Sequence, residues 1–232
     1  MRTYSGRTVC GGSVEGAVAV RRRTEAAFPA PAGIEEEKRR FQRAKSAAME
    51  QLLKLEAQVE SLGGAEAAAI FSVHRLLLED YDYVQMVMEA IDGGKSAQEA
   101  ATAAGRACAA LFEQMEDPYL RERGADMMDI SARVRACLEG GAYPPEAGPE
   151  AVLLAEDFYP SEMAAWQRGP DRALVSSAGS EYSHASILAR ALGAPALVQT
   201  GVPVAELAGG RWNGRVEAGQ GWIVVEEVRD VT

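Results

Sequence analysis

The sequence predicts a mixed α+β, or α/β, fold in which an α/β domain is interrupted by an inserted, all-helical hairpin bundle. Three observations support this fold class. Short runs rich in β-branched residues stand near both ends, helical spacing fills residues 34 to 139, and a glycine- and proline-rich linker, Gly140–Pro149, follows. We expect an α/β domain formed by residues 1–25 and 146–232, and a helical subdomain formed by residues 30–140.

The amino-terminal stretch Thr8–Val20 has β-branched residues around two glycine-containing turns, which predicts two short strands. The pattern then changes. From Ile34 to Leu62 the apolar residues recur at spacings of three and four, as in a long amphipathic helix, and Gly63 and Gly64 end it.

The other helices of the insert are bounded by glycines, by a capping box and by a proline at an allowed first-turn position. Ser96 and Glu99 form the capping box, and Pro118 follows Asp117 at the start of the last helix. The expected helices are Ala65–Leu78, Tyr83–Ile91, about 97–116 and about 117–138.

After the linker, strand and helix signals alternate again, and we expect the amino-terminal strands to join the resulting sheet. A final hairpin is predicted around the turn Ala218–Gly221. The expected elements are a strand Ala151–Ala155, a helix from Ser161, a strand Ala173–Ser176, a helix from His184, a strand Ala196–Val198, and the hairpin strands Gly214–Glu217 and Trp222–Glu226.

Composition narrows the class of protein. The 232 residues are 47% hydrophobic and carry a net charge of −10, which argues against a nucleic-acid partner and for a partner with a basic face, although excess acid can also serve solubility alone. No apolar span long enough for a membrane helix and no signal peptide is present, so we expect a cytoplasmic protein without a membrane partner. Cys10, Cys108 and Cys137 are far apart and predict free, buried or half-buried thiols.

The segment Gly179–Arg190 contains His184, one of only two histidines. A buried strand precedes a small-residue turn, and Ser183 can cap a helix that begins at His184. Free N–H groups and the helix dipole would favour a dianionic phosphate there, and imidazole is a competent nucleophile near neutral pH. By position alone, a histidine at a helix start is more often a surface or capping residue.

The surrounding residues resemble a known signature, Gly-Gly-x-Thr-x-His-(small)-(small)-Ile-x-Ala-Arg. It is shared by enzyme I of the sugar phosphotransferase system, phosphoenolpyruvate synthase and pyruvate phosphate dikinase. Gly179 and the run His184–Arg190 match it. Ser180 replaces the second glycine, Tyr182 replaces a small hydroxylic residue, and Met163 replaces a threonine that can reach the active histidine. These departures bear on the orientation and transfer rate of the histidine.

Two helical motifs narrow the resemblance to the amino-terminal half of enzyme I. Ala69–Asp80 is similar to that family's Ile-Phe-x-x-His-x-x-Leu-Leu-x-Asp stretch, and Asp117–Asp126 to its Asp-x-Tyr-Leu-x-Glu-Arg-Ala-x-Asp stretch. The resemblance implies that the helical subdomain binds the phosphocarrier protein HPr. Leucines at helical spacing are equally compatible with a core, whereas Tyr83 and Arg123 are expected to be exposed contact residues. The docking candidates are Leu76, Leu77, Tyr83, Leu120 and Arg123.

The resemblance also implies a ping-pong phosphoryl transfer from phosphoenolpyruvate, through a phosphohistidine at His184, to HPr. Ser183, Ser186 and backbone N–H groups are expected to stabilise the phosphate, whereas Arg190 either assists them or, as we favour, pairs with a carboxylate of its own domain. No cofactor or metal ligand set is expected in this chain. Enzyme I uses a carboxy-terminal barrel for phosphoenolpyruvate and Mg²⁺, and we expect no such barrel within these 232 residues. We therefore expect the barrel to act in cis or in trans, and the chain not to use phosphoenolpyruvate alone.

Two alternatives remain open. The chain could be the swivelling domain of a synthase or dikinase, although no Gly-rich nucleotide loop is present. It could instead be a non-catalytic module that docks HPr for regulation. Within the insert, His74 is expected to be a hydrogen-bonded packing or interface residue, and Asp126 and Asp129, three residues apart, are expected to be solvated or capping rather than metal ligands.

Overall fold

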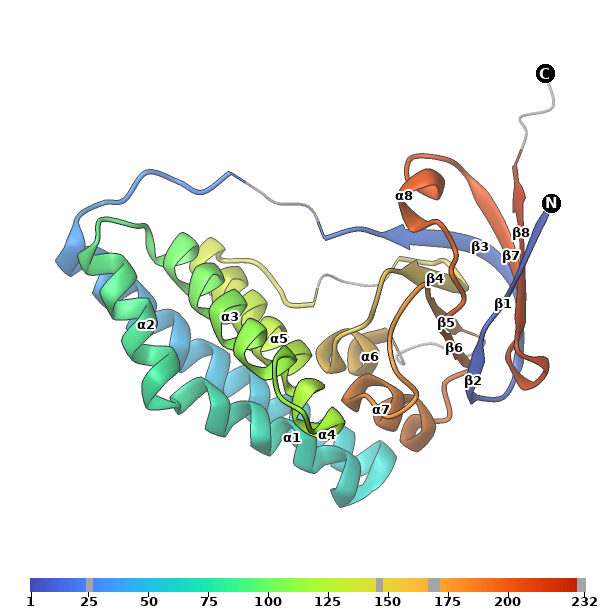
Figure 1. Cartoon of the computed structure of the whole chain (residues 1–232), viewed down its shortest axis with the longest axis horizontal. Helices are drawn as coiled ribbons and strands as arrows, with labels where there is room; N and C mark the ends of the chain where they lie inside the picture. The colour runs from blue at the N-terminus through green and yellow to red at the C-terminus, as the bar shows by residue number, and fades with distance from the viewer. Residues whose placement is uncertain (24–26, 145–147, 167–171, 229–232) are drawn as a thin grey trace. The chain divides into compact units, whose positions relative to one another are not determined.

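The computed structural model describes residues 1–23, 27–144, 148–166 and 172–228 (Figure 1). The chain divides into two compact units. The α/β unit comprises Met1–Thr24, Ala147–Phe158 and Glu162–Thr232, and the helical unit comprises Glu25–Glu146 with Tyr159–Ser161.

One sheet organises the α/β unit, with strand order β1-β8-β7-β3-β4-β5-β6-β2. Neighbours from β3 to β6 run parallel, and the other pairs are antiparallel. Among the described residues the strands are β1 Arg2–Ser5, β2 Arg7–Cys10, β3 Ser13–Arg21, β4 Val152–Ala155, β5 Ala173–Ser176, β6 Ala196–Val198, β7 Trp212–Glu217 and β8 Trp222–Glu227.

The sheet confirms the expected return of the amino-terminal strands and the final hairpin, since β3 pairs with both β4 and β7, and β7 pairs with β8. It adds one element. The amino terminus contains three strands rather than two, because Arg2–Ser5 forms an antiparallel edge strand on β8. β4 and β5 are buried at every position, as expected of parallel strands covered on both faces.

The core of this unit follows the two-residue period of the strands. Alternate residues of β4 and β8, Val152 with Leu154 and Ile223 with Val225, enter one hydrophobic cluster. The unit's helices are α7 His184–Leu192, the short α8 Val204–Leu207, which the sequence pattern did not predict, and the 3-10 turn η1 Ala218–Gln220. α6, Pro160–Trp166, begins in the helical unit and continues in the α/β unit.

The helical unit is built from α1 Ile34–Glu79, α2 Tyr81–Asp92, α3 Ala97–Glu113, α4 Pro118–Arg121 and α5 Arg123–Glu139. Gly64, with φ 84° and ψ 171°, interrupts α1 and so confirms the predicted break between two helices. The expected last helix is instead two, since α4 and α5 are separated at Glu122. The capping box is confirmed on its serine side, because Ser96 accepts the N–H of Glu99.

The helices of this unit pack closely through small residues, most extensively α3 against α5. A Cβ placed on Gly105 of α3 would lie 2.5 Å from Cβ of Ser131 on α5, so a side chain at this crossing would force the helices apart. The three cysteines are free and at least half-buried, as predicted. None of the described helices is both long and apolar enough to span a membrane.

Candidate functional site

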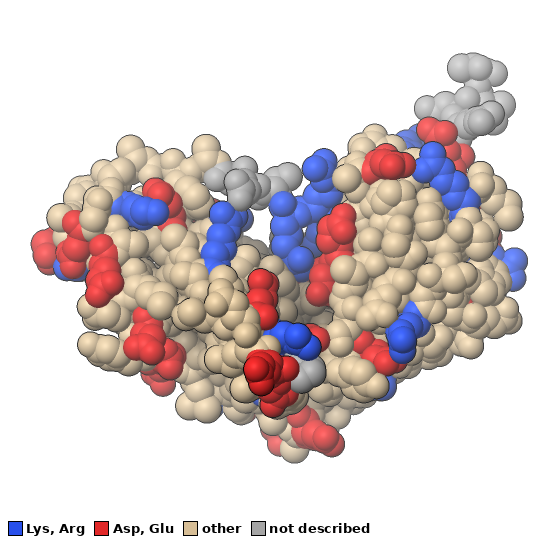
Figure 2. All heavy atoms as spheres, viewed as in Figure 1, with Lys and Arg blue, Asp and Glu red and all other residues tan. Residues whose placement is uncertain are grey.

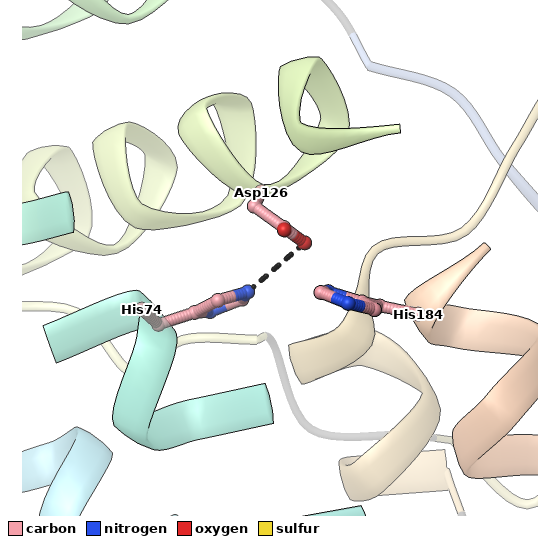
Figure 3. A group of neighbouring side chains, drawn as sticks. All are labelled: His74, Asp126 and His184. Atoms are coloured by element: carbon pink, nitrogen blue, oxygen red, sulfur yellow. Dashed lines mark hydrogen bonds and ion pairs between the residues drawn. The ribbon is translucent and has the colours of Figure 1, made fainter. Parts of the chain in front are cut away.

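His184 is the first residue of α7 (Figure 3). The preceding turn requires glycine at one point: Gly179 has φ 83°, and a Cβ there would lie 2.7 Å from Oδ1 of Asp157. Ser183, with φ −63° and ψ 157°, caps the helix, since its hydroxyl accepts the N–H of Ser186 at 3.2 Å. The predicted cap is confirmed, and α7 therefore begins at the histidine.

The loop before His184 is restrained by its own helix and by β2. Ser186 Oγ donates to the carbonyl of Ser180 at 2.7 Å, and Arg190 Nη1 donates to the carbonyl of Glu181 at 2.8 Å. Arg7 of β2 forms an ion pair with the Glu181 carboxylate at 3.1 Å. The backbone that presents the imidazole is therefore held from two directions.

The electrostatics of this helix start suit an anion. The first N–H groups of an α-helix have no intrahelical acceptor, and the dipole places partial positive charge there. The first turn of α7 contains no acidic residue, and the nearest carboxylate in sequence, that of Glu181, is already paired with Arg7. Within the first turn of α7, a phosphoryl group on the first residue would thus meet backbone N–H donors and no acidic side chain.

Three of the expected phosphate ligands have other partners. The hydroxyls of Ser183 and Ser186 lie 3.2 Å apart, and Ser186 also donates to Ser180. The prediction that Arg190 pairs with a carboxylate is wrong, because the Arg190 guanidinium donates to a backbone carbonyl instead. A backbone carbonyl in the loop can accept an arginine hydrogen bond in place of a carboxylate. The spacing of side chains in the sequence does not reveal such a carbonyl.

The second histidine lies in a polar cluster within the helical unit. His74 Nε2 is 3.1 Å from Oδ1 of Asp126, the interaction dashed in Figure 3, and its Nδ1 is 3.7 Å from Oδ2 of Asp129. Both aspartates are fully buried, so of the two expected roles the solvated one is wrong, whereas Asp129 does cap the start of α6. Asp129 also accepts the Tyr143 hydroxyl at 2.8 Å and the N–H of Ser161, in the first turn of α6, at 2.9 Å. The hydrogen-bonded packing role predicted for His74 is confirmed.

Comparison with known proteins identifies the family. A family model described as the N-terminal part of PEP-utilising enzymes matches residues 5–123, about half of the chain, and a second, described as the mobile domain of PEP-utilising enzymes, matches residues 147–220. The chain belongs to the PEP-utilising enzymes.

Relatives of this chain include the phosphoenolpyruvate-protein phosphotransferases of Bacillus sp. (strain S) and Geobacillus stearothermophilus. The first is 33% identical over 184 residues, 78% of this chain and 32% of that protein. The second is 32% identical over 182 residues, 77% of this chain and 32% of that protein. The chain thus spans about a third of the length of the curated relatives it matches.

Solved structures with the same fold as this chain are amino-terminal parts of enzyme I. The structure titled as the N-terminal domain of Enzyme 1 - Nitrogen gives a TM-score of 0.65 at 22% identity, covering 97% of this chain and 93% of that one. A solution structure of Enzyme I gives 0.63 at 25% identity, covering 96% and 92%. The predicted fold class and the resemblance to enzyme I are confirmed.

The expected docking residues of this chain differ in exposure. Leu76 is 69% exposed, Leu120 is 38% exposed, and Leu77 is half-buried. Tyr83 is fully buried and its hydroxyl lies 3.3 Å from Oγ of Ser131, so the expectation of an exposed contact tyrosine is wrong. The reason is its register on α2, where Tyr83 shares the four-residue spacing of the buried Val87 and Ile91. The same burial raises the pKa of Tyr83.

Arg123 is also less available than expected, with a side chain only 13% exposed. It contacts Asp126 Oδ2 at 3.3 Å, and its guanidinium lies 4.8 Å from the ring centroid of Tyr119. The exposed apolar residues of the helical unit that were not among the candidates include Leu111 at 55%, Met115 at 38% and Tyr119 at 58%. Tyr119 precedes Leu120 in the stretch Asp117–Asp126, and Leu111 lies off the buried, alanine-rich face of α3.

Proposed function

We propose that the chain carries a phosphoryl group on His184 and exchanges it with an HPr-like phosphocarrier protein. In this proposal it is the amino-terminal part of a phosphoenolpyruvate-protein phosphotransferase, an enzyme I. The observation that carries the proposal is the position of His184 as the first residue of the capped helix α7. The names of the relatives support it.

The chemistry is one bond exchange. A ring nitrogen of His184 attacks the phosphorus of a phosphorylated partner, and the new N–P bond forms as the bond from phosphorus to the partner's own group breaks. The protein contributes position and charge stabilisation rather than covalent chemistry of its own. Ser183 fixes the helix start, so that the first-turn N–H groups of α7 face the phosphoryl oxygens.

The polar side chains around His184 then divide into two roles. Ser183 and Ser186 can reach the phosphate only by giving up the 3.2 Å contact between their hydroxyls, which makes the backbone N–H groups the first donors. Arg190 donates to the Glu181 carbonyl, and in this proposal it holds the loop rather than the phosphate.

The partner docks on the helical unit. Leu76 and Leu120 are the strongest of the expected contacts, and Tyr119 joins them as an exposed aromatic residue. On the face seen in Figure 2, acidic side chains form several groups over the helical unit, and the net charge of −10 favours a partner with a basic rim. Leu77 contributes at the edge, Arg123 orients Tyr119, and Tyr83 is excluded by its burial.

The source of the phosphoryl group is part of the same proposal. We assign phosphoenolpyruvate and Mg²⁺ to a barrel domain that acts on this chain in cis or in trans, in the cytoplasm. Residues 1–25 and 146–232 then form the phosphohistidine domain, and residues 30–140 form the phosphocarrier-binding subdomain.

The test is to incubate the purified chain with phosphorylated HPr and to map added phosphoryl mass by mass spectrometry under alkaline conditions that preserve phosphohistidine. We expect the label in the peptide that contains His184 and none in the peptide that contains His74. Labelling of the His184→Ala variant would overturn the site. Binding of phosphorylated HPr without labelling of the wild-type chain would overturn the transfer and favour a non-catalytic docking module.

A further inference from the structure

One residue near the candidate site has an unfavourable backbone conformation. Among the described residues, Gln199 is the only one other than glycine with positive φ, at 56°. L-residues with a Cβ adopt this left-handed region at an energetic penalty, and such residues concentrate where the surrounding structure uses them. Gln199 follows β6 directly and lies in the α/β unit.

The segment that begins at Gln199 holds the turn before His184. The N–H of Gln199 donates to the carbonyl of Ala178 at 2.8 Å. Thr200 donates to the carbonyl of Ser176 through both its N–H and its hydroxyl, at 3.2 and 2.7 Å, and the N–H of Gly201 donates to Ser177 at 3.0 Å. The backbone from Ser176 to Ala178 is therefore fixed by hydrogen bonds from the segment Gln199–Gly201.

A glycine at position 199 would adopt the same φ without strain and would make the same backbone hydrogen bonds. The glutamine adds a single interaction: its Nε2 donates to the carbonyl of Gly179 at 3.1 Å. Gly179 directly follows the fixed segment Ser176–Ala178, and it is the first residue of the loop Gly179–Ser183 that precedes His184.

We propose that Gln199 is a positioning residue for phosphoryl transfer, which holds the loop before His184 through the carbonyl of Gly179. The inference rests on the proposed function of His184. A side chain that only stabilised the fold would be a poor choice here, because glycine would relieve the strained φ. A glutamine at this position is explained by a role of its amide in positioning the loop and not by a gain in stability.

The decisive variant is Gln199→Gly, measured in single-turnover transfer from phosphorylated HPr over a range of HPr concentrations. We expect the maximal rate constant to fall about two- to ten-fold, the range that corresponds to loss of one hydrogen bond. The HPr concentration that gives half-maximal rate should not change, since docking is assigned to the other unit. Thermal stability should stay close to wild type, because relief of the left-handed strain offsets the extra flexibility of the unfolded chain.

Two further variants separate the causes. Gln199→Glu keeps the size and the backbone strain but removes the N–H donor, and we expect it to be at least as slow as Gln199→Gly. Gln220→Ala is the matched control, because Gln220 also has an exposed amide interaction in the same unit, with Trp222, and we expect an unchanged rate.

Each outcome is decisive. A wild-type chain that takes up no phosphoryl group overturns the proposed function, and the inference about Gln199 falls with it. A wild-type chain that reacts while Gln199→Gly reacts equally fast overturns the inference alone. A rate that falls in Gln199→Gly only in proportion to a lost thermal stability would also overturn it, since a purely structural role predicts that result.

Discussion

Replacing Gly105 by alanine is the sharpest test of the packing in the helical unit, because two physical effects oppose each other there. Alanine is favoured over glycine in a helix interior by about 1 kcal/mol. Against this, the new methyl group would lie 2.5 Å from Cβ of Ser131 and 3.3 Å from the carbonyl oxygen of Met127. The nearest atom fixed to α5 is a Cβ, which cannot turn aside as the end of a long side chain can.

We therefore expect the clash to win. Overpacking of a tight core costs about 1–3 kcal/mol, and the rigid obstacle at Ser131 places Gly105→Ala near the upper end. After subtraction of the helix preference, the net loss in unfolding free energy is about 2 kcal/mol. The control Ala110→Gly, at an exposed position of the same helix, should lose about 0.5–1 kcal/mol and so calibrate the helix preference.

The assay is urea unfolding followed by far-ultraviolet circular dichroism, which reports mainly on the helical unit. Adding Ser131→Gly to Gly105→Ala should recover part of the loss, because it removes the Cβ that the alanine meets. Ser131→Gly alone should be destabilising, since the contact between Ser131 and the Tyr83 hydroxyl is lost. A Gly105→Ala variant as stable as wild type, or strictly additive effects in the double variant, would refute the packing argument.

Two further predictions concern a buried carboxylate and the cap of α7. Burial raises the pKa of the Glu37 carboxyl, but the N–H groups of Ala32 and Ala97 and the Arg40 guanidinium together hold that pKa below its ordinary value of 4.5. Ionised Glu37 thus stabilises the helical unit at pH values above 4.5, and this stabilisation is lost as the pH falls through the lower pKa of the folded state. Between about pH 7 and about pH 3, the unfolding free energy of Glu37→Gln should therefore fall less than that of wild type. Ser183→Ala should lower the unfolding free energy of the α/β unit by about 1 kcal/mol, because it removes the cap of α7. Ser183→Asp should keep the cap but slow phosphoryl uptake, because its carboxylate repels the phosphoryl group. Equal uptake by Ser183→Asp and wild type would contradict the assigned anion site.

The elements that could be predicted from sequence are those whose signals are local. β5 and α7 begin at the expected residues, because an apolar run, a glycine turn and a serine cap lie next to one another in the chain. The break at Gly64 follows from a glycine pair in the same way. β1 was missed because a four-residue edge strand has too few positions to show alternation, and its pairing with β8 joins opposite ends of the chain.

Burial of polar residues could not be predicted, because their partners are distant in sequence. Asp126 meets His74 from 52 positions away, and Asp129 meets Ser161 from 32 positions away. Two acids three residues apart on a helix are the usual pattern of a solvated face. Here both aspartates are buried, because hydrogen-bond donors reach them from α1, from Tyr143 and from the start of α6. Only the tertiary structure brings these donors together.

The same reasoning bears on the residues around His184 that depart from the family signature. Ser180, in place of a glycine, uses its hydroxyl to accept the N–H of Tyr182 at 3.1 Å, an interaction that glycine cannot make. The Tyr182 side chain is 74% exposed, so its bulk enters neither the cap nor the core. Met163 is buried in α6, where it supplies no hydroxyl. Ser180 and Tyr182 therefore leave the cap of α7 intact, as the phosphohistidine site that we propose at His184 requires.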